Sequence, residues 1–234
     1  MQNVIIVGAG GHGQVIADIL LSAMEAGEPL HPVGYVDDNP RLHGLKRLGL
    51  PVLGSISDLP ALGHDAVILG IGDNWSRCLL FDRLTEAGEH FVVARHPTAI
   101  IARSVEICLG TVICAGVAVG TGSRIGCNAI LNTACSVDHH NVIGDHAHIA
   151  PGSHLGGDVQ IGPGTLIGIG ASVISQRQVG EWSVVGAGAV VHHSIPGEAV
   201  AVGVPARVTR HLLTVPARQG SNVPAIHHIS APAS

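Results

Sequence analysis

Residues 125–173 read IGCNAI LNTACS VDHHNV IGDHAH IAPGSH LGGDVQ IGPGTL IGIGAS V, which places an aliphatic residue at every sixth position. The same spacing extends from Ile101 to Val191 and fills sixteen consecutive register positions with Ile, Leu or Val. A glycine often follows the register position, and a small side chain usually stands four residues after it. This hexapeptide pattern predicts a parallel β-helix in which each repeat supplies one short strand and one corner, three repeats to a coil.

The first 97 residues follow a different pattern, in which short aliphatic runs alternate with longer amphipathic stretches. The alternation predicts strands over 4–7, 32–36, 67–71 and 91–94 and helices over 14–26 and 75–87. We therefore expect an α/β half-Rossmann domain over 1–97 and a β-helix domain over 98–196. A short C-terminal segment over 197–234 should follow, and it shows no period from about residue 214.

The overall composition favours work on small molecules. The chain has 234 residues, of which 46% are hydrophobic and only 2% aromatic, so its core must be built from aliphatic side chains. A net charge of -5 with 12 Lys and Arg residues argues against a nucleic-acid or anionic-membrane surface. There is no basic leader and no apolar run long enough to span a bilayer, so we expect a cytoplasmic protein.

The cysteines show no metal-binding or disulfide pattern. Their number is odd, at five, and no pair has the C-x-x-C spacing. We expect them to be small buried side chains in a reducing compartment.

A glycine-rich turn, Gly8-Ala9-Gly10-Gly11-His12-Gly13, lies between the first predicted strand and the first predicted helix. Such a turn brings backbone N–H groups to a phosphate at the helix N-terminus, and Asp37 and Asp38 at the end of the next strand can bind a ribose or a base. A tight structural turn is the alternative. Because 97 residues cannot hold a six-stranded dinucleotide sheet, a nucleoside diphosphate fits better than NAD.

The repeat array contains a candidate general base, His139, in the segment Ser136–Asn141. It stands two residues after a register position, and so on or near a corner, and His148 follows half a coil later. A neutral imidazole is suited to proton removal at pH 7, although an exposed polar face is the alternative interpretation. We expect no metal site, because adjacent histidines on a strand point to opposite sides and no carboxylate or thiolate is spaced to complete a site.

Seven motifs in this order resemble those of the sialic-acid-O-acetyltransferase-like sugar acetyltransferases, particularly bacterial N-acetyltransferases that act on nucleotide-linked 4-amino-4,6-dideoxy sugars. The motifs are GAGGHG at 8–13, GYVDD at 34–38, GIGDN at 70–74 with Arg77, HPTA at 96–99, NTACSVDHH at 132–140, IGDHAHIAPG at 143–152 and GVPAR at 203–207. The resemblance implies a left-handed, triangular β-helix and a homotrimer. It also implies acetyl-CoA between adjacent subunits and a nucleotide-linked amino sugar on the N-terminal domain.

The resemblance also implies roles for individual residues. His139 is expected to be the catalytic base, with His140 at the position where the family usually has Asp or Glu. The substrate-binding residues are expected to be Gly10, Gly11, His12, Asp37, Asp38, Asn74, Arg77 and Asn132. The residues that contact acetyl-CoA are expected to be His148, Gly157, Gly168 and Ala187. Since His140 replaces the usual acid, we expect it to orient His139, and we expect the Gly157 N–H to stabilise the oxyanion.

The expected reaction is acetyl transfer from acetyl-CoA to a sugar amine by direct attack on the thioester. Two alternatives remain at this point. One is O-acetylation of sialic acid or a related sugar hydroxyl, and the other is a non-catalytic trimer that binds nucleotide sugars.

Overall fold

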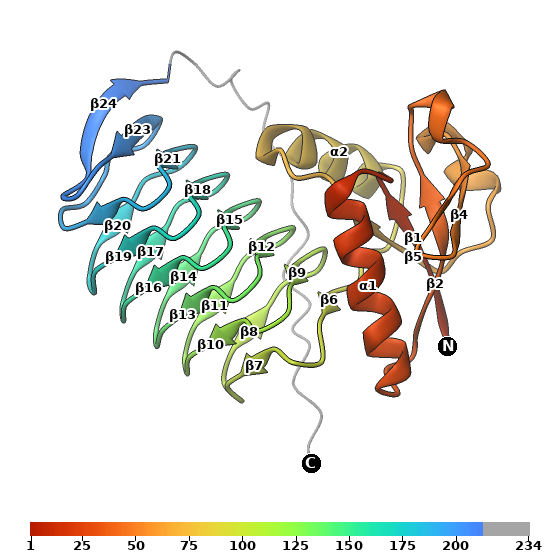
Figure 1. The fold of residues 1–234 in the computed structure, drawn as a ribbon, viewed down its shortest axis with the longest axis horizontal. Coiled ribbons are helices and arrows are strands. Elements are labelled where there is room, and N and C mark those ends of the chain that lie inside the picture. Colours follow the sequence, from red (N-terminus) through yellow and green to blue (C-terminus); the bar gives the residue numbers. More distant parts are fainter. Residues whose placement is uncertain (213–234) are drawn as a thin grey trace. The chain divides into compact units, whose positions relative to one another are not determined.

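The computed structural model describes residues 1–212 and divides between Pro97 and Thr98 into two compact units (Figure 1). The tail after about residue 214, for which the sequence showed no period, lies outside the described residues. The two units are described separately below.

The first unit is an α/β sheet with strand order β3-β4-β2-β1-β5 (Figure 1). Its parallel core consists of β1 (Gln2–Val7), β2 (Leu30–Val36), β4 (Leu50–Gly54) and β5 (Ala66–Leu69), while β3 (Lys46–Arg47) pairs antiparallel with β4. The helices are α1 (Gly11–Glu25) and α2 (Asn74–Glu86), with the short 3-10 segments η1 (Pro40–Leu42) and η2 (Ile56–Ala61). Val4 to Val7 are fully buried, so β1 forms the centre of the core.

The sequence predicted most of these elements, with three differences. Helix α1 begins at Gly11 rather than residue 14, because the glycine-rich turn itself forms the first helical turn. Strands β3 and β4 and the segment η2 were not predicted; this stretch is short and interrupted by Pro and Gly residues. The expected strand 91–94 is interrupted, because Phe91 forms a single bridge to Val67 and Ala94 belongs to the two-residue strand β6 (Ala94–Arg95).

The second unit is a left-handed β-helix whose two-residue strands run from β7 to β22 (Figure 1). The first face holds β7 (Ile100–Ile101), β10 (Ala118–Val119), β13 (Ser136–Val137), β16 (His154–Leu155), β19 (Ser172–Val173) and β22 (Val190–Val191). The second face holds β8 (Glu106–Ile107), β11 (Arg124–Ile125), β14 (Val142–Ile143), β17 (Gln160–Ile161) and β20 (Gln178–Val179). The third face includes β9 (Val112–Ile113), β12 (Ile130–Leu131), β15 (His148–Ile149), β18 (Leu166–Ile167) and β21 (Val184–Val185).

The sixfold register explains this architecture. Strands on one face pair in parallel with a shift of eighteen residues, as Val119 with Val137 and Val137 with Leu155. The register side chain points inward and is buried, as Val137 is at 1% exposure, whereas the residue before it faces outward. Left-handed corner positions are taken by glycines, such as Gly122 with φ 70°, and also by other residues, among them His140 and Asp158, each with φ 57°.

Up to residue 212, the C-terminal segment continues the β-helix and does not form a separate piece. Strand β23 (Ala199–Val202) pairs in parallel with β21 on the third face, and β24 (Arg207–His211) pairs antiparallel with β23. The antiparallel strand therefore covers an edge that would otherwise expose unpaired backbone groups.

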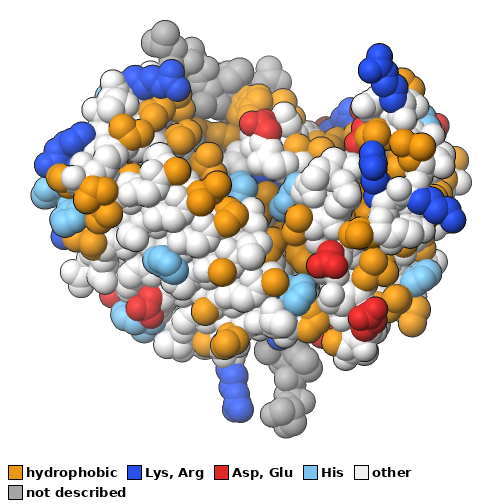
Figure 2. Space-filling model, in the orientation of Figure 1, with side chains coloured by type: hydrophobic (Ala, Val, Ile, Leu, Met, Phe, Trp, Pro, Cys, Tyr) orange, Lys and Arg blue, Asp and Glu red, His pale blue; other side chains and the backbone are white. Residues whose placement is uncertain are grey.

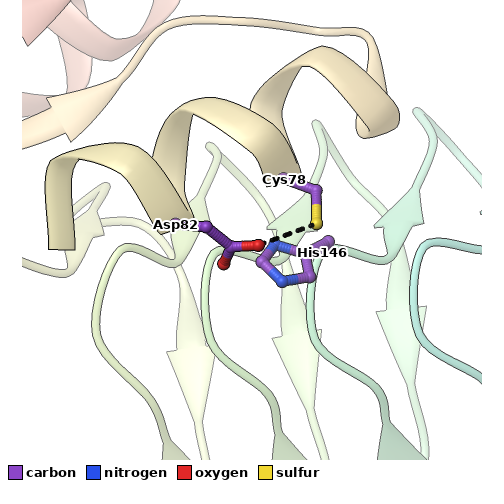
Figure 3. Close-up of side chains that lie close together, drawn as sticks. All are labelled: Cys78, Asp82 and His146. Atoms are coloured by element: carbon purple, nitrogen blue, oxygen red, sulfur yellow. Dashed lines mark hydrogen bonds between the residues drawn. The ribbon is translucent and has the colours of Figure 1, made fainter. Parts of the chain in front are cut away.

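The cysteine expectation was wrong for two of the five residues. Cys108 and Cys127 form a disulfide between neighbouring coils, where the sequence predicted free thiols. Their separation of 19 residues is one more than the eighteen-residue coil, so the coil length was the signal that pointed to this pair. Cys78, Cys114 and Cys135 are buried thiols outside the disulfide, as expected, and the Cys78 thiol on α2 donates to Oδ2 of Asp82 at 3.9 Å (Figure 3).

The surface agrees with the low count of basic residues. Figure 2 shows the Lys and Arg side chains spread over this face rather than gathered into one basic patch. Among residues 1–212, no helix has the length and apolar character needed to cross a membrane.

Candidate active site

His139 and His140 lie at a corner of the β-helix, where the chain passes from β13 on the first face to β14 on the second. We call the series of corners that links these two faces the His139 edge; it includes residues 120–123, 138–141, 156–159 and 174–177. Nδ1 of His139 lies 3.0 Å from Nδ1 of His140, and the two exposed rings meet at 77°. The left-handed backbone of His140 turns the two side chains toward each other, so strand alternation does not apply here.

The imidazole of His139 lies over Gly157 in the next coil. A Cβ atom at Gly157 would collide with Cε1 and Nε2 of His139, and the φ angle of Gly157 is not in the left-handed region. Glycine is therefore required here for space rather than for backbone conformation. Within residues 1–212 the Gly157 N–H has no hydrogen-bond acceptor.

Asn141 holds the His139 corner to the coil above it. Its side chain is fully buried, and its Nδ2 donates to the carbonyls of Asp138 at 2.6 Å and Gly156 at 3.0 Å. Its Oδ1 accepts the backbone N–H of Val159 at 2.9 Å. Sequence analysis gave Asn141 no role, although an asparagine at a position that usually takes a small residue was a signal.

Asp158 is the second residue at this corner that sequence analysis missed. A ring nitrogen of His139, a ring nitrogen of His140 and a carboxylate oxygen of Asp158 all lie within 4.8 Å of one another. The expectation that no carboxylate is spaced to join these histidines was therefore wrong. Asp158 follows His140 by eighteen residues, the length of one coil, and this spacing was the missed signal.

Asn132 and His148 form a second group on a different edge of the prism. We call the series of corners that links the third face to the first the Asn132 edge; it includes residues 132–135, 150–153, 168–171 and 186–189. Nδ2 of Asn132 lies 3.0 Å from Nε2 of His148, and Oδ1 of Asn132 accepts the Thr133 N–H at 2.8 Å. Because Oδ1 accepts this N–H, the amide nitrogen Nδ2 is the group of Asn132 that faces His148.

The expected acetyl-CoA residues divide between the two edges. Gly168 and Ala187 lie on the Asn132 edge in successive coils, where a Cβ atom at Gly168 would lie 2.7 Å from the Ala187 nitrogen. Gly157 lies on the His139 edge. A single β-helix therefore does not bring all of these residues together.

The glycine-rich turn of the first unit ends at the N-terminus of α1. Gly10 is the N-cap residue, and there is open space around Gly10 and Gly11. Asp37 accepts the N–H groups of Ala9 at 2.8 Å and Asn39 at 2.9 Å. Both oxygens of Asp37 are thus engaged by the chain itself, and this carboxylate holds the turn in shape.

Asp38 is exposed at the end of β2, and its Oδ1 accepts the Ile56 N–H at 2.9 Å. The same residue lines a cavity of about 410 Å³ within the first unit.

Arg77 differs from its expected role as a substrate contact. It is 0% exposed, and its guanidinium donates to the carbonyls of Ile71 and Gly72, both at 3.2 Å, and to Oδ1 of Asn74 at 2.9 Å. Burial lowers the pKa of Arg77 to about 10. The structure therefore gives Arg77 the role of holding the loop after β5, with Asn74 as one of its acceptors.

His12 lies beside this loop in α1 and is half-buried. Burial, and then the positive charge of Arg77, lowers its pKa to about 4. At neutral pH the imidazole is therefore uncharged, so it offers a ligand a hydrogen bond but no positive charge.

Comparisons with known proteins identify the class to which this combination of units belongs. Residues 3–84 match the family model of the PglD N-terminal domain. The structure superposes on a histidine-to-asparagine mutant of perosamine N-acetyltransferase from Caulobacter crescentus in complex with CoA and GDP-perosamine, with a TM-score of 0.83 and 36% identity over 90% of this chain and 98% of that one. An α/β unit followed by a hexapeptide β-helix is thus the combination found in these sugar acyltransferases, and the chain is of this class.

Two further relatives specify the family. The acetyltransferase domain of PglB from Neisseria gonorrhoeae superposes with a TM-score of 0.81 at 32% identity, over 89% of this chain and 100% of that domain. UDP-N-acetylbacillosamine N-acetyltransferase from Bacillus subtilis is 37% identical over 115 residues, and this match spans about half of each chain, 48% and 51%. The chain belongs to the family of nucleotide-linked amino-sugar N-acetyltransferases.

Proposed function

We propose that this chain transfers the acetyl group of acetyl-CoA to the 4-amino group of a nucleotide-linked 4-amino-4,6-dideoxy sugar. The observation that carries the proposal is the contact between His139 and His140, with Nδ1 atoms 3.0 Å apart. This contact occupies Nδ1 of His139 and leaves Nε2, on the far side of an exposed ring, as the atom that faces a substrate. The complex of the Caulobacter enzyme with CoA and GDP-perosamine supports the substrate class.

The histidine pair supplies a general base without a formal charge. In the productive tautomer Nδ1–H of His139 donates to Nδ1 of His140, so Nε2 of His139 carries a free lone pair. The sugar amine attacks the thioester carbonyl carbon while its proton passes to Nε2. The C–S bond then breaks, and the departing thiolate of CoA takes up a proton, which regenerates the base.

A histidine in this role is also consistent with work on a relative. Two structures of perosamine N-acetyltransferase have one histidine replaced, by asparagine in one and by alanine in the other, and both are in complex with CoA and GDP-perosamine.

Gly157 is our candidate for the oxyanion donor. Its N–H has no acceptor among the described residues, and its Cα lies beneath the His139 ring. Donors of this kind contribute about 3 kcal/mol to stabilisation of the tetrahedral intermediate.

The glycine-rich turn is our candidate for the diphosphate site. Open space around Gly10 and Gly11 at the N-terminus of α1 leaves room for an anion, and the helix dipole favours negative charge there. Asp38 is exposed, and only its Oδ1 accepts a backbone N–H, that of Ile56, so its Oδ2 is our candidate to bind the ribose or the base; both oxygens of Asp37 accept backbone amides.

We further propose that the active enzyme is a homotrimer with acetyl-CoA between adjacent subunits. His139 and Gly157 lie on one edge of the prism, while Asn132, Gly168 and Ala187 lie on another. A site that uses both groups needs the His139 edge of one copy and the Asn132 edge of the next.

The decisive experiment replaces His139 by Ala and assays acetyl transfer with UDP-, dTDP- and GDP-linked 4-amino sugars. We expect at least about a 100-fold loss of turnover. Gln160→Ala, at an exposed strand position in the next coil, serves as the control and should leave the rate unchanged. Full activity of His139→Ala in intact oligomers would remove the assignment of the base.

The same assay separates the alternatives. Transfer to free sialic acid in preference to the amino sugars would support O-acetylation. Absence of acetyl-CoA binding in calorimetry would support a binding protein without catalysis.

A further inference from the structure

Asp158 is a carboxylate placed against the histidine pair from the next coil of the β-helix. Its carboxylate oxygen lies within 4.8 Å of the ring nitrogens of His139 and His140, and its backbone N–H donates to the carbonyl of His139 at 3.0 Å. The backbone bond ties the two corners together and so places residue 158 beside the pair.

The proposed reaction creates a positive charge that this corner must accommodate. When Nε2 of His139 takes the amine proton, the ring becomes an imidazolium whose Nδ1–H still donates to His140. His140 is neutral in that arrangement, so it holds the ring but supplies no negative charge. A carboxylate nearby stabilises the charged form, most strongly when bound substrates exclude water from the corner.

The charged and titratable groups around the pair leave Asp158 as the one that faces both rings. Asp138, on the same corner, accepts the His139 backbone N–H with its Oδ1 at 2.8 Å. The coil before supplies Thr121 and Gly122, which do not titrate. Arg177 stands two coils further along the same edge, at the corner position that Asn141 has in the histidine coil. Its Nε donates to the His192 carbonyl at 2.9 Å.

We propose that Asp158 is a positioning residue that stabilises the positive charge of the His139–His140 pair during proton transfer. The inference rests on the proposed function of His139 as the base. In this chain the carboxylate near the base is therefore that of Asp158, one coil further along the β-helix, and not a side chain at residue 140, where the family usually has Asp or Glu. The proton passes from the amine to Nε2 of His139 and leaves with the departing thiolate, and Asp158 takes no part in the transfer itself.

The test compares Asp158→Asn, which keeps the shape and removes the charge, with the double variant His140→Asp/Asp158→Asn. We expect Asp158→Asn to lower kcat about three- to tenfold at pH 7 with little change in KM. We also expect the acid limb of its kcat profile to move to lower pH, because the protonated form of the base loses a stabilising negative charge; a merely structural role would not produce this shift. In the double variant a carboxylate at residue 140 replaces the lost charge, so kcat should recover.

The control is Glu181→Gln, which removes one exposed carboxylate from a different corner of the same unit and should not change the profile. An unchanged kcat and pH profile for Asp158→Asn, with His139→Ala inactive, would overturn the role of Asp158 while leaving the base intact. An active His139→Ala would instead overturn the proposed function itself. Loss of activity on dialysis against a chelator, with recovery on adding Zn²⁺, would assign the three residues to a metal site and also overturn the proposal.

Discussion

At the scale of single residues, the site depends on the lack of a side chain at Gly157 as much as on the histidines. The His139 ring occupies the space that a side chain at Gly157 would fill. The ring and the glycine therefore form one unit, in which any larger residue displaces the base.

Gly157→Ala should separate this steric effect from backbone strain, because the φ angle of Gly157 suits any residue. We expect a loss of kcat of about 100-fold, as His139 must leave its place above the corner. The Tm should change little. Steady-state kinetics and thermal unfolding on the same preparation measure both.

The matched control is Gly197→Ala, another glycine of the β-helix unit without a left-handed φ angle. Its new Cβ would meet its nearest neighbour at 3.4 Å, an ordinary contact. Equal losses of activity in the two variants would contradict the argument.

His12 gives a prediction about stability. Its pKa is about 4 in the folded chain against an ordinary value of 6.5, so the unfolded chain binds the proton more tightly. The free energy of unfolding should therefore stay constant above pH 6.5 and fall between pH 6.5 and 4, by about 3 kcal/mol at pH 4. His12→Asn should lose this part of the pH dependence, as measured by urea unfolding at pH 7, 5.5 and 4.5. The exposed His90→Asn should keep it, and parallel curves for His12→Asn and the unaltered protein would refute the assignment.

Sequence reasoning singled out His139 from its place after a register position and His140 from the family resemblance, and the structure places their ring nitrogens 3.0 Å apart. It could not foresee the internal hydrogen bonds of Arg77 and Asp37, because a motif shows which residues are present and not which groups they already bind. Both side chains are engaged by the backbone of their own unit. Asp158 was missed for a different reason, since its link to His140 runs across coils.

At the scale of elements, the sixfold register determined the β-helix because it repeats one simple packing rule. The strands of the first unit were harder to place where no period exists. Strands β3 and β4 lie in such a stretch; β4 is stabilised by pairing with β2 and β3 by pairing with β4, rather than by a pattern of their own.

The corner at 138–141 depends on one buried amide. Asn141→Ala would leave the Val159 N–H and the carbonyls of Asp138 and Gly156 without this partner in the interior. We expect a loss of about 3 kcal/mol in the free energy of unfolding, measured by denaturant titration. Gln160→Ala, on the surface of the next coil, should cost less than about 0.5 kcal/mol. A loss for Asn141→Ala as small as that would show that water or a backbone shift satisfies these groups.

At the scale of the whole molecule, the number of cysteines that an alkylating reagent modifies tests the fold. Burial raises the pKa of the Cys114 thiol to about 11 and that of Cys135 to about 12, and Cys78 is also buried. Iodoacetamide should therefore add to none of the five in the native protein. After unfolding without a reductant it should add to three, and after reduction to five, as read by intact mass. Five additions without a reductant would contradict the disulfide between Cys108 and Cys127.

The arrangement of site residues on two edges predicts that defective subunits can repair one another. His139→Ala damages the His139 edge and Asn132→Ala damages the Asn132 edge, so an oligomer of either variant alone should have no intact site. In a random mixture, a site is intact when its His139 edge comes from an Asn132→Ala subunit and its Asn132 edge comes from a His139→Ala subunit. That combination arises in about a quarter of the sites, so co-expressed subunits should recover about a quarter of full activity.

A mixture of His139→Ala with Gly157→Ala, which damages the same edge, should recover none. No recovery in the first mixture, with both homomeric variants inactive and the mixed oligomers confirmed by mass, would mean that each chain builds its site alone.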